Sequence, residues 1–173
     1  MSVEKGYKHW HEDIQANDSP LEAGLGFTCD FSKEFRGKEV LLQQKAEGLK
    51  KRLICLSTDE NDFLWNLEPI YRDGVACGFL RRTHFGFSAG RHIGYGYIES
   101  EKLGGQELTM KFLKAGTYEI EIGGQKRVPA TFHPKCVFDP KGLRVQGDYG
   151  EEVASAGEVG ATDKNKQAAN ASA

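Results

Sequence analysis

Short apolar or alternating runs, separated by turns that contain glycine, constrain the fold of this chain most strongly. Asp73-Gly74 lies between two such runs, and an Asp-Gly pair in that position is a strong signal for a two-residue hairpin turn. Gly123-Gly124 divides two later runs in the same way. The runs lie at residues 53–56, 75–80, 93–97, 108–112, 118–122 and 128–132. Several short strands at such spacing predict an antiparallel barrel or sandwich over about residues 53–138.

One strand-like run contains the sequence Gly94-Tyr95-Gly96-Tyr97. Glycine inside a strand commonly marks a close approach of another chain segment. We therefore interpret these glycines as relieving crowding rather than as a phosphate-binding loop.

The first fifty residues show a different pattern. Residues 37–48 carry Val40, Leu41, Leu42 and Ala46 among Lys, Glu and Gln, and they end at a glycine. This pattern predicts an amphipathic helix of about three turns. Five apolar residues precede it in loop-rich sequence, and one short helix covers few of them, so we expect them to need a partner surface: Leu21, Leu25, Phe27, Phe31 and Phe35. The expected fold class is mainly β, with a small α+β N-terminal part.

Composition argues against two classes of protein. The 173 residues carry a formal net charge of −2, which is not the polybasic footprint of a nucleic-acid binder. No uninterrupted apolar run approaches the roughly 20 residues of a membrane span. The first ten residues show neither an apolar signal core nor an Arg/Ser-rich transit composition. We therefore expect no nucleic-acid or membrane partner.

The end of the chain and the cysteines are simpler to interpret. Residues 151–173 contain no aromatic residue, and Val153 and Val159 are their only larger apolar side chains. Such a segment buries too little surface to offset its ordering entropy, so we predict a disordered tail over residues 150–173. The four cysteines form no C-x-x-C pair, which favours reduced structural thiols over a zinc or redox motif.

Few residues suggest chemistry on their own. His9 and His11, followed by Glu12, could ligate a metal, although histidines in a loop are commonly just solvated. The adjacent Arg81 and Arg82 could hold a carboxylate bidentately, or they could be a solvated strand end.

Two glutamates stand before small-residue turns. Glu4 precedes Lys5-Gly6, and Glu22 precedes Ala23-Gly24. A carboxylate beside such backbone could accept paired hydrogen bonds from the edge of a heterocycle. Helix capping or a surface salt bridge is the alternative.

These residues carry a family resemblance. Two segments are similar to the folate-binding aminomethyltransferase fold of the glycine cleavage T-protein. They are Val3-Glu4-Lys5-Gly6-Tyr7-Lys8-His9-Trp10-His11 and Asp18-Ser19-Pro20-Leu21-Glu22-Ala23-Gly24. They resemble still more the C-terminal region of mitochondrial sarcosine and dimethylglycine dehydrogenases. The similarity continues through Glu68-Pro69-Ile70-Tyr71-Arg72-Asp73-Gly74 to Asp139-Pro140-Lys141-Gly142-Leu143-Arg144-Val145, and so covers about residues 3–149.

The resemblance implies a T-protein-like C-terminal β-barrel at residues 51–149, preceded at residues 1–50 by the end of the folate-binding domain. Glu4 falls on the family glutamate that hydrogen-bonds the pterin of tetrahydrofolate, and Trp10 falls where an aromatic lies near the folate. Glu22 matches a second glutamate with a structural role. The resemblance places no catalytic residue and no metal ligand in this chain.

The resemblance also implies what lies elsewhere. In the family, a flavin (FAD) oxidises the N-methyl group of sarcosine, and the one-carbon unit is captured on tetrahydrofolate in the mitochondrial matrix. The flavin domain and the transfer aspartate lie upstream of the matched region, and they would be this chain's partners. We expect this chain alone not to oxidise sarcosine.

Three alternatives remain open. The chain could be a fragment of a sarcosine dehydrogenase. It could be a short folate-binding or regulatory module that resembles the pyruvate dehydrogenase phosphatase regulatory subunit. It could also be a structural barrel without a ligand.

Overall fold

The computed structural model describes residues 2–59, 61–124 and 126–149, and the tail predicted over residues 150–173 lies outside them. The chain divides into two compact units, residues 1–140 and 141–173. Within the second unit the described part contains one 3-10 turn, Arg144–Gln146, which ends at Gly147.

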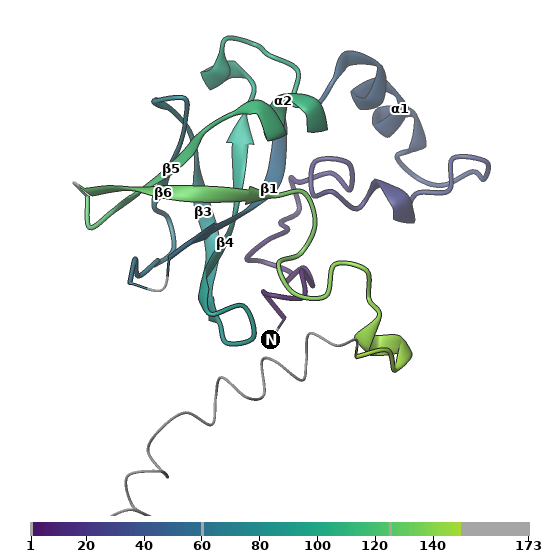
Figure 1. Cartoon of the computed structure of the whole chain (residues 1–173). Coiled ribbons are helices and arrows are strands. Elements are labelled where there is room, and N and C mark those ends of the chain that lie inside the picture. Colours follow the sequence, from purple (N-terminus) through teal and green to yellow (C-terminus); the bar gives the residue numbers. More distant parts are fainter. Residues whose placement is uncertain (1, 60, 125, 150–173) are drawn as a thin grey trace, which may run out of the picture. The chain divides into compact units, whose positions relative to one another are not determined.

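A closed antiparallel barrel of six strands forms most of the first unit (Figure 1). The strands are β1 (Lys51–Thr58), β2 (Pro69–Arg72), β3 (Val75–Gly86), β4 (Arg91–Glu99), β5 (Tyr118–Ile122) and β6 (Lys126–His133). Their order around the barrel is β1-β4-β3-β2-β5-β6, and β1 closes it by pairing with β6. The prediction of an antiparallel barrel is confirmed.

Both predicted hairpin turns are present. Asp73 and Gly74 have φ angles of 51° and 80° between β2 and β3, and Gly123 and Gly124 have 59° and 73° between β5 and β6. Asp73 and Gly74 form the two-residue turn whose twist matches that of paired strands, whereas Ile122 pairs with Lys126, so the connection between β5 and β6 is one residue longer. These turns therefore fix the register of two of the six strand pairs.

The glycines of β4 relieve crowding, as predicted. A Cβ atom on Gly96 would lie 2.4 Å from the carbonyl oxygen of Phe79 and 2.8 Å from the Cδ1 atom of Ile70. A Cβ atom on Gly94 would lie 2.8 Å from a methyl group of Leu80. No side chain fits at these points, because β3 and the core already fill the space.

Side chains of β1 and β4 alternate between two apolar clusters, because successive residues of a strand point to opposite faces. One set fills the barrel core and comprises Ile54, Leu56, Leu64, Ile70, Cys77, Leu80, Ile98, Leu108, Leu113, Tyr118, Ile120 and Val128. The other set comprises Val3, Leu53, Cys55, Ile93, Tyr95 and Tyr97. Val3 belongs to the second set, so the N-terminal segment packs on the outer face of β1 and β4.

One predicted strand is wrong. Leu108, Met110 and Phe112 alternate in sequence, but Met110–Ala115 is a short helix, α2. Thr109 caps this helix by accepting a hydrogen bond from the backbone N–H of Phe112 at 3.1 Å. Leu113, three residues after Met110, reaches the barrel core. The Thr109 cap and the helical spacing of Met110 and Leu113 favour a helix more strongly than the alternating apolar residues favour a strand.

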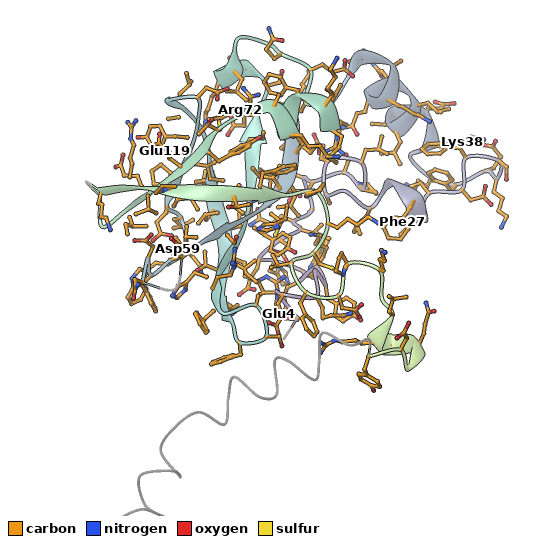
Figure 2. The ribbon with its side chains drawn as sticks, in the orientation of Figure 1. Glu4, Phe27, Lys38, Asp59, Arg72 and Glu119 are labelled. Atoms are coloured by element: carbon orange, nitrogen blue, oxygen red, sulfur yellow. The ribbon has the colours of Figure 1, made fainter. Side chains whose placement is uncertain are left out.

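The predicted helix before the barrel is present as α1 (Lys38–Glu47), between Gly37 and Gly48. Its expected amphipathic character is wrong, because Leu41 is its one buried side chain while Val40 and Leu42 are 59% and 43% exposed. Of the five apolar residues expected to need cover, Phe27 is 85% exposed (Figure 2). Within the described residues, no helix has the length and apolar character to cross a membrane.

Candidate functional site

Ion pairs fasten the N-terminal segment to the barrel. Asp13 is fully buried, and its carboxylate contacts the Arg82 guanidinium at 3.1 Å and 2.6 Å. Asp18 contacts Arg81 and Lys51 at 2.5 Å and 2.6 Å. The adjacent arginines therefore do hold carboxylates, but these carboxylates belong to the chain itself. The solvated alternative is wrong for Arg82, which is only 3% exposed.

Glu4 lies beside the loop that joins β3 and β4 (Figure 2). Its carboxylate is buried, and it accepts hydrogen bonds from the backbone N–H of Ser88 at 3.0 Å and from the Ser88 hydroxyl at 3.2 Å. Its carbonyl oxygen accepts from the N–H of Phe138 at 2.9 Å. The Glu4 carboxylate therefore accepts two hydrogen bonds, and both donors belong to Ser88 of the chain itself.

For Glu22 the structure shows the capping role that was the alternative to ligand binding. Its carboxylate accepts from the N–H of Ser19 at 2.8 Å, while the N–H of Glu22 donates to the Ser19 hydroxyl at 3.2 Å. This reciprocal pair is a capping box. The carbonyl of Glu22 also accepts from the N–H of Leu53 at 2.8 Å, so the turn is fixed to β1.

Trp10 is half exposed, at 53%, and its ring meets the His11 ring edge-on at 5.6 Å. His9 lies 3.5 Å from Glu12, and both side chains are largely solvated. Among residues 2–59, 61–124 and 126–149, no three His, Cys, Asp or Glu side chains gather closely enough to hold a metal.

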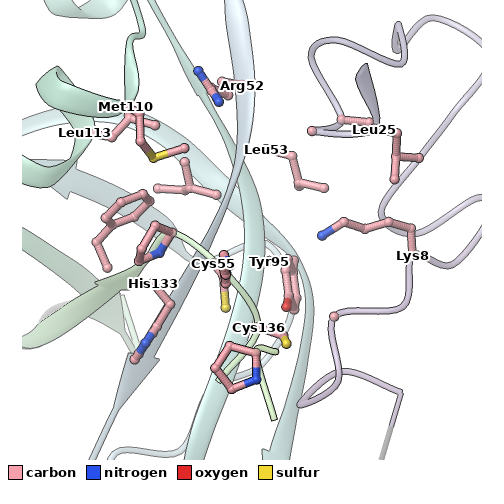
Figure 3. Close-up of a pocket in the computed structure, with 18 of the residues that line it drawn as sticks. Lys8, Leu25, Arg52, Leu53, Cys55, Tyr95, Met110, Leu113, His133 and Cys136 are labelled. Carbon is pink, nitrogen blue, oxygen red and sulfur yellow. The ribbon is translucent and has the colours of Figure 1, made fainter. Parts of the chain in front are cut away.

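An open pocket of about 550 Å³ lies between the N-terminal segment and the barrel (Figure 3). The segment forms one wall, the loop at residues 23–27 a second, and β1 with the end of β6 a third. Its lining is apolar and cationic, and it contains no Asp or Glu: Lys5, Gly6, Tyr7, Lys8, Ala23, Gly24, Leu25, Phe27, Arg52, Leu53, Ile54, Cys55, Tyr95, Met110, Leu113, Phe132, His133, Pro134, Lys135, Cys136 and Pro140. Glu4 and Trp10 are not in the lining, although Lys5–Lys8 between them are.

The cations of the pocket are not equivalent. Lys5 pairs with Asp139, and this hydrogen bond raises its pKa. Lys8 extends over the Tyr95 ring, with its Nζ atom 3.9 Å from the ring centroid, and burial lowers its pKa. Arg52 donates to the carbonyl of Leu108 at 2.8 Å, and burial also lowers its pKa.

Burial disfavours the ionised forms of Cys55 and Tyr95, which also line the pocket. Burial raises the pKa of the Cys55 thiol to about 11 and also raises the pKa of Tyr95. His133 shares a 2.7 Å hydrogen bond with the Ser57 hydroxyl, and burial lowers its pKa. A thiol that stays protonated is a weak nucleophile. The Cys55 thiol is therefore not activated as a nucleophile.

Sequence reasoning identified Glu4 and Trp10 but not Lys8 or Arg52. Lys8 is one of several lysines in a polar segment, and nothing in its neighbours distinguishes it. Its position depends on contact between residue 8 and strand β4, which lies almost ninety residues later in the chain.

Comparison with known proteins identifies the family. A family model described as the glycine cleavage T-protein C-terminal barrel domain matches residues 51–139. Mitochondrial sarcosine dehydrogenase from Mus musculus is 45% identical over 151 residues, which cover 86% of this chain and 16% of the relative. The mitochondrial pyruvate dehydrogenase phosphatase regulatory subunit from Mus musculus is 32% identical over 149 residues, covering 80% and 17%. The chain thus spans about a sixth of the length of these relatives.

A solved structure supports the fold. The aminomethyltransferase T of the glycine cleavage system from Bartonella henselae superposes with a TM-score of 0.65 at 16% sequence identity, covering 80% of this chain and 37% of that one. At that identity the likeness concerns the fold alone. Because the family model matches more than half of its residues, the chain belongs to the glycine cleavage T-protein C-terminal barrel domain family.

Proposed function

We propose that this chain is the tetrahydrofolate-binding C-terminal part of a sarcosine-demethylating flavoenzyme, and that its pocket holds the folate. The observation that carries the proposal is the pocket itself. Its volume of about 550 Å³ lies in the usual range for small-molecule sites. Its apolar walls and cationic lining suit a flat aromatic ligand that bears carboxylates, and the absence of acids from the lining avoids repulsion of such a ligand.

Within this proposal, each part of the chain has a defined task. Tetrahydrofolate, when bound, supplies the nitrogens that accept the one-carbon unit. Leu25, Phe27 and Met110 would pack against its rings and exclude water. The barrel keeps these walls rigid, because its core is fully buried.

Glu4 would bind the pterin edge by exchanging one donor pair for another. Its two carboxylate oxygens accept from the backbone N–H and the hydroxyl of Ser88, so the ring N–H groups of a pterin would replace both donors only when the loop that carries Ser88 moves away from Glu4. Trp10, half exposed on the same segment, would offer an aromatic face near the ligand. In this scheme residues 1–50 are the end of a folate-binding domain, residues 51–149 the barrel domain, and residues 150–173 a tail.

The flavin would come from polypeptide outside this chain. The similar dehydrogenase is about six times longer than the matched region, so the chain by itself is expected not to oxidise sarcosine. The names of the relatives include a mitochondrial location, which supports the mitochondrial matrix as the site of action.

Folate binding by Glu4 can be tested with the purified 173-residue chain. We expect 5-formyltetrahydrofolate to bind in isothermal titration calorimetry, and Glu4→Gln to weaken binding about ten- to hundredfold, because a hydrogen bond to a charged group contributes roughly 1.5–3 kcal/mol. Ser88→Ala is the matched control, since it removes the hydroxyl donor and frees one carboxylate oxygen of Glu4, while the backbone N–H of residue 88 still donates to the other. This variant should bind at least as tightly as the unmodified chain. Equal affinity in a folded Glu4→Gln variant, or no binding at millimolar folate, would contradict the proposal.

A regulatory role is the second candidate. It is favoured by the 32% identity to the pyruvate dehydrogenase phosphatase regulatory subunit, a protein named for regulation. An antibody against the barrel separates the two candidates in the source tissue. A band much heavier than the 19.2 kDa of this chain favours the enzyme part, and a single band at 19.2 kDa favours the module.

A further inference from the structure

Lys8 lines the pocket as an amine that has no counter-ion in the described part of the chain. No carboxylate among those residues lies within 4.0 Å of its Nζ atom. Asp13, the acid that most affects its charge, is bound to Arg82 through contacts of 3.1 Å and 2.6 Å. An ammonium group that leaves water without gaining an anion is destabilised, so this site favours the neutral amine.

The Lys8 side chain is held with its amine toward the barrel. Figure 3 shows it extending from the N-terminal segment toward β1 and the Tyr95 ring. The Nζ atom lies 3.9 Å from the ring centroid, and this contact favours the ammonium form. Burial acts in the opposite direction and lowers the pKa of Lys8. The ring therefore orients an amine that gives up its proton more readily than an exposed lysine does.

The other groups that face Lys8 supply little negative charge. Arg82 on β3 is a second cation, and it also lowers the pKa of Lys8. Cys55 on β1 and Cys136 after β6 are thiols, and burial raises the pKa of Cys55 to about 11. Asp13 raises the pKa of Lys8, but its carboxylate is paired with Arg82. A desolvated lysine beside another cation is the arrangement that makes an amine nucleophilic toward carbonyl compounds.

We propose that Lys8 binds a small aldehyde covalently, as an imine at its Nζ atom. The lone pair of the neutral nitrogen forms a bond to the aldehyde carbon, and the carbonyl oxygen takes up a proton that the nitrogen gives up. The C–O bond then breaks, and the oxygen leaves as water with the second proton of the nitrogen. No electrons are exchanged with an oxidant or a reductant, and water reverses the reaction.

This inference rests on the proposed function for the source of the aldehyde. Two-electron oxidation of an N-methyl group, followed by addition of water, releases the methyl carbon as formaldehyde, the smallest aldehyde. Lys8 lines the pocket in which we place the folate. An imine at Lys8 would hold the released carbon in that pocket and prevent its escape into bulk water.

Reductive trapping provides the test. The purified 173-residue chain is mixed at about pH 6 with one equivalent of deuterated formaldehyde and with cyanoborohydride, which reduces an imine to a stable N-methyl group, and peptide mass spectrometry locates the label. We expect Lys8 to be methylated about tenfold or more faster than Lys50, an exposed lysine outside the pocket, because each unit by which a pKa falls raises the fraction of neutral amine about tenfold. The difference should narrow at about pH 10, where exposed lysines also lose their protons. Cyanoborohydride leaves formaldehyde adducts of the Cys55 and Cys136 thiols unlabelled.

A pair of matched variants reads the same reaction from the mass of the intact chain. Lys8→Arg keeps the positive charge but removes the amine, and it should lower the label taken up at about pH 6 to the level of the remaining amines. Lys50→Arg should leave the uptake unchanged. Equal labelling of Lys8 and Lys50 at about pH 6 would overturn the inference. An advantage of Lys8 that stays constant with pH would also overturn it, since access rather than a neutral amine would then set the rate.

The outcome is independent of the outcome for folate. Selective labelling of Lys8 in a chain that binds no folate supports the aldehyde site and contradicts the proposed function. Folate binding that depends on Glu4, in a chain whose Lys8 is labelled no faster than Lys50, overturns the inference and leaves the proposed function standing.

Discussion

The barrel and the segment before it are stabilised by different forces. In the barrel, twelve side chains form a single apolar core inside six paired strands. In residues 2–50, half of the buried residues are acids. The buried set comprises Val3, Glu4, Asp13, Glu22, Ala23 and Leu41. Each of the three acids accepts hydrogen bonds from a named partner.

This difference shows how a polar segment can be fixed in one position. Apolar contacts tolerate small displacements, whereas a carboxylate held through two contacts by Arg82 fits one register only. The segment forms one wall of the pocket, so the position of Lys8 depends on these ion pairs. We therefore expect charge substitutions to affect the pocket and apolar substitutions to affect the whole unit.

The largest effect expected from breaking the polar attachment is at Asp13. Asp13→Asn keeps the shape but leaves the buried Arg82 with only the half-exposed Glu12, 3.8 Å away, as counter-ion, so the free energy of unfolding should fall by about 3 kcal/mol. Hydrogen exchange should locate the effect. The amides of Tyr7 and Ile14, which donate within the segment, should exchange much faster, while amides in the middle of β4 change less.

Leu56→Ala is the matched control in the barrel. Leu56 is fully buried, and its truncation should cost about 3–5 kcal/mol. Here the amides of β4 and of the segment should lose protection together. If Asp13→Asn loosened both regions equally, the proposed difference between them would be wrong.

A smaller effect is expected from pH at Asp18. Burial raises the pKa of this carboxyl, but hydrogen bonds from Arg81, Lys51 and the N–H of Gln15 outweigh it and hold the pKa below its ordinary value of 3.8. A carboxyl with a depressed pKa in the folded state stabilises the fold above that ordinary value. This stabilisation is lost as the pH falls through the lower folded value.

Urea unfolding between about pH 5 and pH 2 measures this loss. The unmodified chain should lose its stability advantage over Asp18→Asn across that range. A difference between the two that stays constant with pH would show that the Asp18 charge contributes nothing.

Local sequence was sufficient for the barrel and its hairpins. Asp73-Gly74 and Gly123-Gly124 are residue pairs that favour positive φ angles, and they adopt them. The alternation in β4 follows from the two-residue period of a strand. Local sequence gave the wrong prediction at residues 108–112. Three alternating apolar residues indicated a strand there, but a threonine cap favours a helix. Local sequence also failed for α1, whose apolar residues do not share one buried face.

The candidate site was less predictable, because it is assembled from distant parts of the chain. The Arg81-Arg82 pair indicated that carboxylates would be held, but no local pattern identifies Asp13 and Asp18 as those carboxylates. Glu4 was singled out by its family motif, while its partner Ser88 lies 84 residues away. Lys8 differs from the other lysines of its segment only in the folded chain, where its ammonium group lies over the Tyr95 ring of the barrel.

The central claim is that the segment and the barrel together form a folate pocket. The most direct measurement is a crystal structure of the 173-residue chain grown with 5-formyltetrahydrofolate. The account predicts density for the ligand between residues 5–8 and β1. Ligand density elsewhere on the chain, with the pocket still open to solvent, would contradict it.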